Sequence, residues 1–376
     1  MTRHPRTAIN AIFFINGFLH ANLASRYPRV QELFGLSNGN FGLVLLSVSV
    51  GAVLAMPFTG WLIIRNGSRR IGIFSVFSYA IFFPLVTFMP GMPGLMALFF
   101  VMGVTAGMLD VSMNAQAVMV ERNIGKPIMS SFHALFSIGM AIGAFCGSLV
   151  EEWSISLPVH LASVTAISLV IAFWVRYHLV HDAPQSTSDG PAFQLPNAAM
   201  VSIGVIAFCC MTGEGAMADW TTNFMERISK SPKAMAPLGL SAFALAMTIG
   251  RIFGDKARAH FGDKKLMVGC GLISVAGLVL ALWWIDPYAS IAGFFLVGIG
   301  LSVIVPIAYS IAGNSTEVSP GVGLAMVTTV GYTGFLFGPP VIGFFADLSD
   351  IRMALLFVMA LFVVMTILSY RYKRPG

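Results

Sequence analysis

Charged residues are scarce in this sequence. Asp, Glu, Lys and Arg make up 10% of the 376 residues, whereas a soluble globular domain carries about 25%. The hydrophobic fraction is 57%, and the mean hydropathy is +0.82. This amount of charge cannot cover a water-facing surface. The composition therefore excludes an ordinary soluble protein and indicates a membrane protein.

Sequence motifs for catalysis, metal binding and nucleotide binding are also missing. The four cysteines lie inside apolar runs without metal-ligand spacing. There is no Gly-rich phosphate loop followed by Lys and Ser or Thr, and no Ser or Cys stands in a nucleophile motif. We therefore expect no enzyme, no metal, no cofactor and no nucleic-acid partner.

Apolar runs recur along the whole chain, each long enough to cross about 30 Å of hydrocarbon as an α-helix. Charged, Pro and Gly breaks separate twelve predicted spans, near residues 7–26, 38–64, 71–89, 93–120, 127–150, 157–177, 198–225, 236–258, 265–285, 288–312, 320–346 and 351–371. The predicted fold class is an all-α membrane protein, with twelve transmembrane helices in two pseudo-symmetric six-helix bundles.

A polar stretch separates two halves of similar content. Residues 181–197 predict a cytoplasmic linker between an N-terminal bundle, 1–180, and a C-terminal bundle, 198–376. In each half the second helix ends in a short basic turn and the fifth is rich in glycine. Two six-helix halves built alike are typical of transporters with a site at their interface, near the bilayer midplane.

Lys and Arg are distributed unevenly between the two sides of the predicted membrane. Sixteen of the 22, Arg251 included, fall on the side that holds both termini. This positive-inside pattern predicts that both termini are cytoplasmic, and one miscounted span would invert it.

One carboxylate interrupts the apolar run between Arg70 and Glu121. Asp110 lies about 16 Å from Glu121 along the predicted fourth helix, near the midplane, and Asn114 shares its helix face. His133 in the next helix lies level with Asn114. Because intramembrane acids are typical of proton and ion pathways, we interpret Asp110 as a proton site. The alternative is a permanent pair with His133 or a cation that only fixes helix packing.

Other polar residues inside the predicted spans are candidate substrate contacts. Glu214 lies between two glycines, and an interrupted helix can offer backbone groups to a ligand, so we predict roles in substrate binding and proton coupling. The remaining predicted contacts are Asn16, His20, Asn114, His133, Trp220 and Tyr332. Helix–helix hydrogen bonds are the alternative for Asn16 and His20, and an interfacial anchor is the alternative for Trp220.

Basic residues near helix ends, with neighbouring acids, are predicted to act in gating: Arg65, Arg69, Arg70, Asp219, Arg251, Asp255 and Arg258. Arg251 and Asp255 are spaced for an i, i+4 ion pair. Making or breaking such a pair would bias inward-open against outward-open states. Control of topology by positive charge is the alternative role for the basic turns.

The chain resembles the major facilitator superfamily along its whole length. Gly60-x4-Arg65-x-Gly67-x-Arg69-Arg70 is similar to that superfamily's loop motif between helices two and three, except that Ile64 stands where an acid is usual. We expect the second half to carry the acid–base pairing instead. Asp110-x3-Asn114 resembles the fourth helix of L-fucose-permease-like proton symporters, and residues 131–139 and 214–220 resemble the YbjJ-like bacterial inner-membrane branch.

The resemblance implies a proton-coupled transporter that takes up a small polar solute, sugar-like or organic, across the bacterial inner membrane by alternating access. The expected partners are the solute, protons and the lipid bilayer, and the expected state is a monomer. A proton-driven exporter is the alternative. Exporters of this superfamily share a Gly-Pro motif on helix five, whereas here Gly-Pro-Pro falls at 338–340 on helix eleven. A non-transporting receptor is the third possibility.

Overall fold

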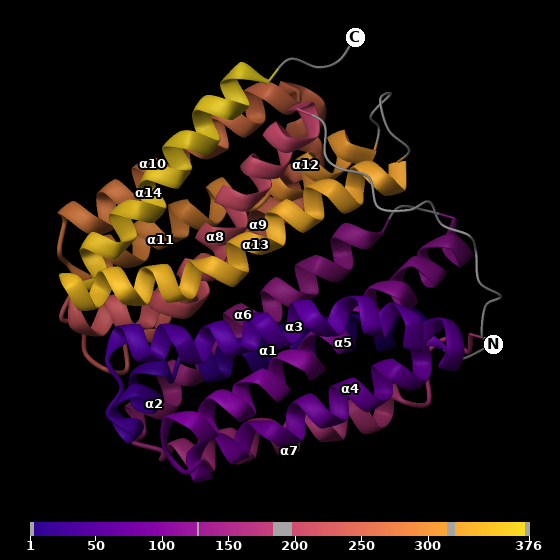
Figure 1. The fold of residues 1–376 in the computed structure, drawn as a ribbon, viewed down its shortest axis with the longest axis horizontal. Coiled ribbons are helices and arrows are strands. Elements are labelled where there is room, and N and C mark those ends of the chain that lie inside the picture. The colour runs from indigo at the N-terminus through magenta and orange to yellow at the C-terminus, as the bar shows by residue number, and fades with distance from the viewer. Residues whose placement is uncertain (1–3, 126–127, 183–197, 314–319, 373–376) are drawn as a thin grey trace. The chain divides into compact units, whose positions relative to one another are not determined.

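The computed structural model describes residues 4–125, 128–182, 198–313 and 320–372 (Figure 1). The chain divides into two compact units, Met1–Ser188 and Asp189–Gly376. Most of the predicted linker, residues 183–197, lies outside the described residues. The first unit contains α1 (Pro5–Ala24), α2 (Tyr27–Phe34), α3 (Asn38–Asn66), α4 (Ser68–Phe82) with the 3-10 helix η1 (Phe83–Phe88), α5 (Gly91–Ile124), α6 (Met129–Glu152) and α7 (Leu157–Val175).

The described part of the second unit likewise consists of helices joined by short connections. Its helices are α8 (Ala198–Arg227), α9 (Pro237–Phe261), α10 (Asp263–Trp283), α11 (Pro287–Leu301), α12 (Ile304–Gly313), α13 (Pro320–Leu348) and α14 (Ile351–Arg371). The predicted tenth span is broken between α11 and α12. Pro306 explains the break, because a proline lacks the N–H for the i−4 bond and its ring clashes with that carbonyl, here of Ser302.

Twelve helical segments in the described part of the chain are long and apolar enough to cross a membrane, six in each unit, with α11 and α12 together forming one span, Pro287–Ala312. This confirms the predicted fold class. The fourth span, predicted as 93–120, runs as Gly91–Ile124, because a helix continues past the apolar window until a terminating residue. Gly125 supplies that end with a left-handed φ of 69°, which glycine adopts without steric cost.

The two units repeat the same pairing of helices. The first span packs against the fifth, α1 on α6 and α8 on α13. The second packs against the fourth, α3 on α5 and α9 on α11, and the third packs against the sixth, α4 on α7 and α10 on α14. The shared pairing explains why the two halves of the sequence carry similar patterns.

Glycines allow these paired helices to touch backbone to backbone. A Cβ added at Gly17 in α1 would lie 2.1 Å from the carbonyl oxygen of Phe136, and one at Gly139 in α6 would lie 2.3 Å from that of Phe14. In the second unit, a Cβ at Gly334 in α13 would lie 2.7 Å from the oxygen of Phe208. The glycine-rich fifth and eleventh spans are therefore explained by close helix packing, as in other membrane bundles.

Candidate functional site

The predicted proton site lies in the middle of α5. Asn114 Nδ2 donates hydrogen bonds to the backbone oxygen of Asp110, at 2.8 Å, and to its carboxylate Oδ1, at 3.3 Å. Both side chains are partly exposed. Asp110 lies about 21 Å along the helix from its end at Ile124. The contact expected from the four-residue spacing is therefore present, deep in the span.

Further predicted solute contacts of the first unit lie on helices α1 and α6. Asn16 Nδ2 lies 3.8 Å from the sulfur of Met113, next to Asn114 on α5. The ring of His133 on α6 meets Phe13 of α1 edge-on, with centroids 5.2 Å apart. Asn16 is buried, and its contact with Met113 links α1 to α5; the part of Asn16 in solute binding stays a prediction. His20 is half-buried on α1.

Glu214 lies in an unbroken helix, contrary to the predicted interruption. The structure shows α8 as one helix through both flanking glycines. A Cβ at Gly213 would lie 2.2 Å from the ring of Phe362 in α14, and one at Gly215 would lie 3.0 Å from the ring of Phe335 in α13. The glycines therefore make room for two aromatic rings rather than freeing backbone groups.

The carboxylate of Glu214 faces a cation from the neighbouring helix. Arg251 Nη2 of α9 lies 3.8 Å from Glu214 Oε2, and the Cys210 thiol donates to Glu214 Oε1 at 3.6 Å. Arg251 lies ten residues inside the end of α9, deeper than the sequence-based charge count assumes. Without Arg251, most Lys and Arg residues still lie on the predicted cytoplasmic side.

Three further predicted residues of the second unit lie on α8 and α13. Trp220 is fully buried, which argues against the interfacial anchor, because such an anchor is exposed at the membrane surface. Asp219 is half-buried beside it. Tyr332 on α13 packs its ring against Phe335, with centroids 6.0 Å apart, and Phe335 covers Gly215.

The basic turn of the first unit is held by an acid that the sequence analysis missed. Asp182, after α7, accepts hydrogen bonds from the backbone N–H of Ser68 and Arg69 and, at 2.6 Å, from the Ser68 hydroxyl. Arg69 Nη2 donates to the backbone oxygen of Arg176 at 2.7 Å. Asp182 thus caps α4, whose N-cap residue Gly67 has no side chain to do so.

Replacing Asp182 by Ala should destabilise the first unit. Loss of an N-cap acceptor costs about 1 kcal/mol, which lowers the Tm by about 2–4 °C in a domain of this size. The measurement is thermal unfolding of the detergent-purified protein. Asp182→Asn keeps an acceptor oxygen and should lose less. Equal Tm values for wild type and Asp182→Ala would show that the cap contributes nothing.

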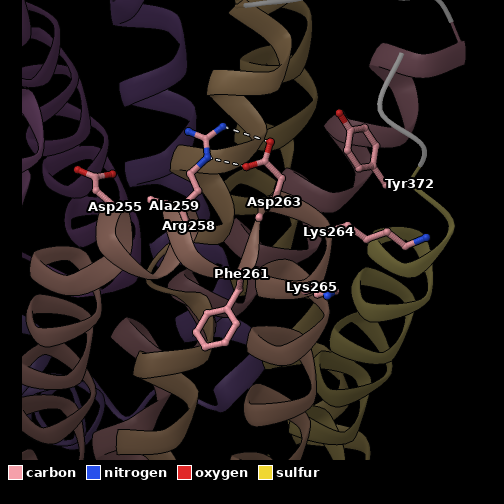
Figure 2. Close-up of a pocket in the computed structure, with 9 residues that line it drawn as sticks. Asp255, Arg258, Ala259, Phe261, Asp263, Lys264, Lys265 and Tyr372 are labelled. Carbon is pink, nitrogen blue, oxygen red and sulfur yellow. Dashed lines mark hydrogen bonds and ion pairs between the residues drawn. The ribbon is translucent and has the colours of Figure 1, made fainter. Parts of the chain in front are cut away.

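The basic turn of the second unit, residues 258–265, contains its own ion pair. Arg258 donates to Asp263 from Nε at 2.6 Å and from Nη2 at 3.3 Å, and Figure 2 shows the two side chains facing each other. They line an open pocket of about 860 Å³ with Asp255, Lys264 and others. The acid–base pair expected in this half is Arg251 with Asp255, whereas the ion pairs here join Arg258 to Asp263 and Arg251 to Glu214.

The remaining predicted gating residues of the first turn point outward. Arg65 stacks over the ring of Trp61, with its guanidinium carbon 4.2 Å from the ring centroid. Arg65 and Arg70 are exposed. Exposed cations at a helix end are consistent with control of topology, and their part in gating stays a prediction.

A buried ion cluster at the far end of the first unit was also missed. Arg26 Nε and Arg29 Nε each lie 3.3 Å from Glu151 Oε1 at the end of α6. Burial lowers the pKa of Arg26, and the Glu151 carboxylate opposes that shift. Nearby, His160 of α7 bonds to Asn22 Oδ1 at 2.9 Å. These contacts join α1, α2, α6 and α7, which indicates a structural role.

The helix count, the repeated pairing and the intramembrane acids define a multi-pass helical membrane protein of two six-helix units. The family model "Major Facilitator Superfamily" matches residues 9–256 and 203–376. The chain therefore belongs to the major facilitator superfamily, a class of transporters rather than enzymes.

Curated relatives and solved structures agree with this assignment. An uncharacterized MFS-type transporter of Yersinia pestis is 35% identical over 91% of this chain and 89% of its own. Membrane protein MosC of Rhizobium meliloti is 31% identical over 98% and 90%. The nucleoside transporter NupG has the same fold, with a TM-score of 0.76 at 13% identity over 98% of this chain and 99% of its own.

Proposed function

We propose that this protein imports a small polar solute together with a proton across the bacterial inner membrane, by alternating access, as a monomer with both termini in the cytoplasm. The observation that carries the proposal is the Asp110 carboxylate in the middle of α5, hydrogen-bonded by Asn114. Intramembrane acids are rare and typically lie on proton or ion pathways. Family membership supports transport as the activity.

The bond between Asn114 and the Asp110 backbone suits a site that gains and loses a proton. This 2.8 Å bond does not depend on the charge of the carboxylate. The amide therefore stays in place while Asp110 is protonated, and its bond to Oδ1 favours the charged form once the proton leaves. Asp110 and Asn114 together form a proton site whose geometry is kept through the cycle.

The remaining predicted residues are assigned proposed roles. In the first unit we propose solute contacts from Asn16, His20, Asn114 and His133. In the second unit we propose solute contacts from Glu214, Trp220 and Tyr332. We also propose that Glu214 takes part in proton coupling. Gating is proposed for Arg65, Arg69, Arg70, Asp219, Arg251, Asp255 and Arg258. We also propose that the chain lies in the YbjJ-like branch with L-fucose-permease-like features.

Uptake into proteoliposomes tests the proposal. The panel should include D-glucose and D-mannose, because a Bacillus subtilis relative, 22% identical over 95% of this chain and 91% of its own, is a glucose/mannose transporter, and it should include sugar acids. An inward proton gradient should drive accumulation of at least one solute. Accumulation that occurs only with the opposite gradient would favour an exporter, and uptake indifferent to pH would contradict proton coupling.

A further inference from the structure

Arg251 occupies an unusual position for a cation. It lies about 15 Å from the end of α9 at Phe261 and about 21 Å from its start at Pro237. The other Lys and Arg residues of the described spans lie within a few residues of a span end. A guanidinium near the bilayer midplane is costly and marks a functional site by default.

The contact between Arg251 and Glu214 is long for an ion pair, and neither side chain is fully buried. Their nearest atoms lie 3.8 Å apart, and the two side chains are 17% and 18% exposed. A charge-assisted N–H···O bond measures about 2.7–2.9 Å, and a carboxylate can bind a guanidinium through two such bonds. A better-placed carboxylate could therefore replace Glu214 on Arg251.

The groups facing Glu214 come from several helices. On α8 itself the Cys210 sulfur lies 3.6 Å from Glu214 Oε1 and 3.6 Å from the backbone oxygen of Leu301 in α11, so its single hydrogen can be donated to either acceptor. Elsewhere on α8, the Tyr309 hydroxyl of α12 contacts the sulfur of Met211. From α14 the nearest group is the ring of Phe362, over Gly213. Among the described residues, Arg251 is the charged group in contact with Glu214.

We propose that Arg251 is the receptor for a carboxylate on the transported solute, and that protonation of Glu214 releases Arg251 for it. This inference rests on the proposed proton-coupled transport and names its substrate class. The proton that Asp110 takes up from outside is the one that then binds a Glu214 oxygen and leaves to the cytoplasm with the solute. No covalent bond to the solute forms or breaks.

Charge balance explains why the two ligands would bind together. Charged Glu214 with Arg251 is neutral, and so is protonated Glu214 with Arg251 and a carboxylate. Binding of a proton alone adds one positive charge to the span, binding of a carboxylate alone adds one negative charge, and binding of both leaves the net charge unchanged. The two singly loaded states are penalised near the midplane. Proton and anion therefore bind cooperatively, and the loaded site carries the same charge as the empty one.

Ligand-induced thermal stabilisation of the purified protein tests the inference with D-glucuronate against D-glucose, and D-gluconate against sorbitol. In wild type, the sugar acids should bind and the neutral partners should bind at least about tenfold more weakly, since a tenfold change equals 1.4 kcal/mol. Affinity for the acids should rise as the pH falls. Glu214→Gln, which imitates the protonated state, should bind them equally at every pH.

Substitutions of Arg251 complete the test. Arg251→Gln and the double variant Glu214→Gln/Arg251→Gln should lose carboxylate binding, and the double variant removes both charges and so guards against misfolding. Arg251→Lys should lose part of it, because an ammonium lacks the two-pronged geometry. Lys256→Gln, an exposed cation on the same helix, is the matched control and should bind as wild type does.

Two sets of results would overturn the inference. One is binding of neutral solutes alone, or of no panel member; the other is carboxylate binding that survives in the double variant or is independent of pH in wild type. The proposed function is judged separately, by gradient-driven uptake. A protein that accumulates neutral sugars on a proton gradient would keep the proposed function and refute the role of Arg251.

Discussion

Replacing Asp110 by Asn should abolish accumulation of the solute while leaving its exchange across the membrane intact. With an inward gradient of one pH unit, coupling to one proton can sustain about tenfold accumulation, because one unit is worth 1.36 kcal/mol. Asn has nearly the same shape but cannot take up a proton. The accumulation ratio should therefore fall to about one, measured as uptake against counterflow in proteoliposomes.

A matched control separates this effect from a general loss of charge. Glu152→Gln removes a carboxylate from the exposed end of α6, outside the proposed proton pathway, and should accumulate solute as wild type does. If Asp110→Asn still accumulates solute on a pH gradient, Asp110 is not the proton site. The alternative from the sequence, in which Asp110 only fixes helix packing, would then be preferred.

Replacing Gly139 by Leu should disrupt the first unit. A Cβ there would lie 2.3 Å from the backbone oxygen of Phe14 and 2.9 Å from the backbone nitrogen of Phe18. Because backbone atoms cannot rotate away as a side chain can, α1 and α6 must separate. Overpacking of this kind costs about 3 kcal/mol, or about 6–12 °C in Tm. Thermal unfolding in detergent, with the yield of folded protein, measures it.

Gly60→Leu is the control for this substitution. Gly60 also lies inside a membrane helix, α3, but a Cβ there meets no atom within 4 Å. The variant should unfold at or above the wild-type Tm, since Leu favours helix more than Gly does. Equal Tm losses in both variants would mean that the loss at Gly139 comes from a general effect of leucine and not from the helix crossing.

The spans and the Asp110–Asn114 contact could be predicted because they depend on local sequence. Hydrophobic runs identify where a transmembrane helix lies, and a four-residue spacing fixes a shared helix face whatever the surroundings. Asn114 accordingly bonds to Asp110 within one turn of α5. The local sequence pattern therefore identifies the transmembrane helices and the residues that meet on the same helix.

Contacts between helices depend on how the helices pack, and sequence spacing does not reveal them. Arg251 has an acid at i+4, yet it faces Glu214 on the preceding helix. The acid usual at residue 64 is absent, and Asp182, 114 residues beyond Ser68, binds the first basic turn instead. For Glu214, flanking glycines suggested a broken helix, whereas they accommodate rings from α13 and α14.

Solute-induced proton movement tests proton coupling most directly. Proteoliposomes containing a pH-sensitive dye should acidify inside when a solute from the uptake panel that the protein transports is added outside, with no pH gradient applied beforehand. Asp110→Asn should exchange the same solute without acidification. If wild-type vesicles take up the solute and their internal pH does not change, the account of this protein as a proton symporter is contradicted.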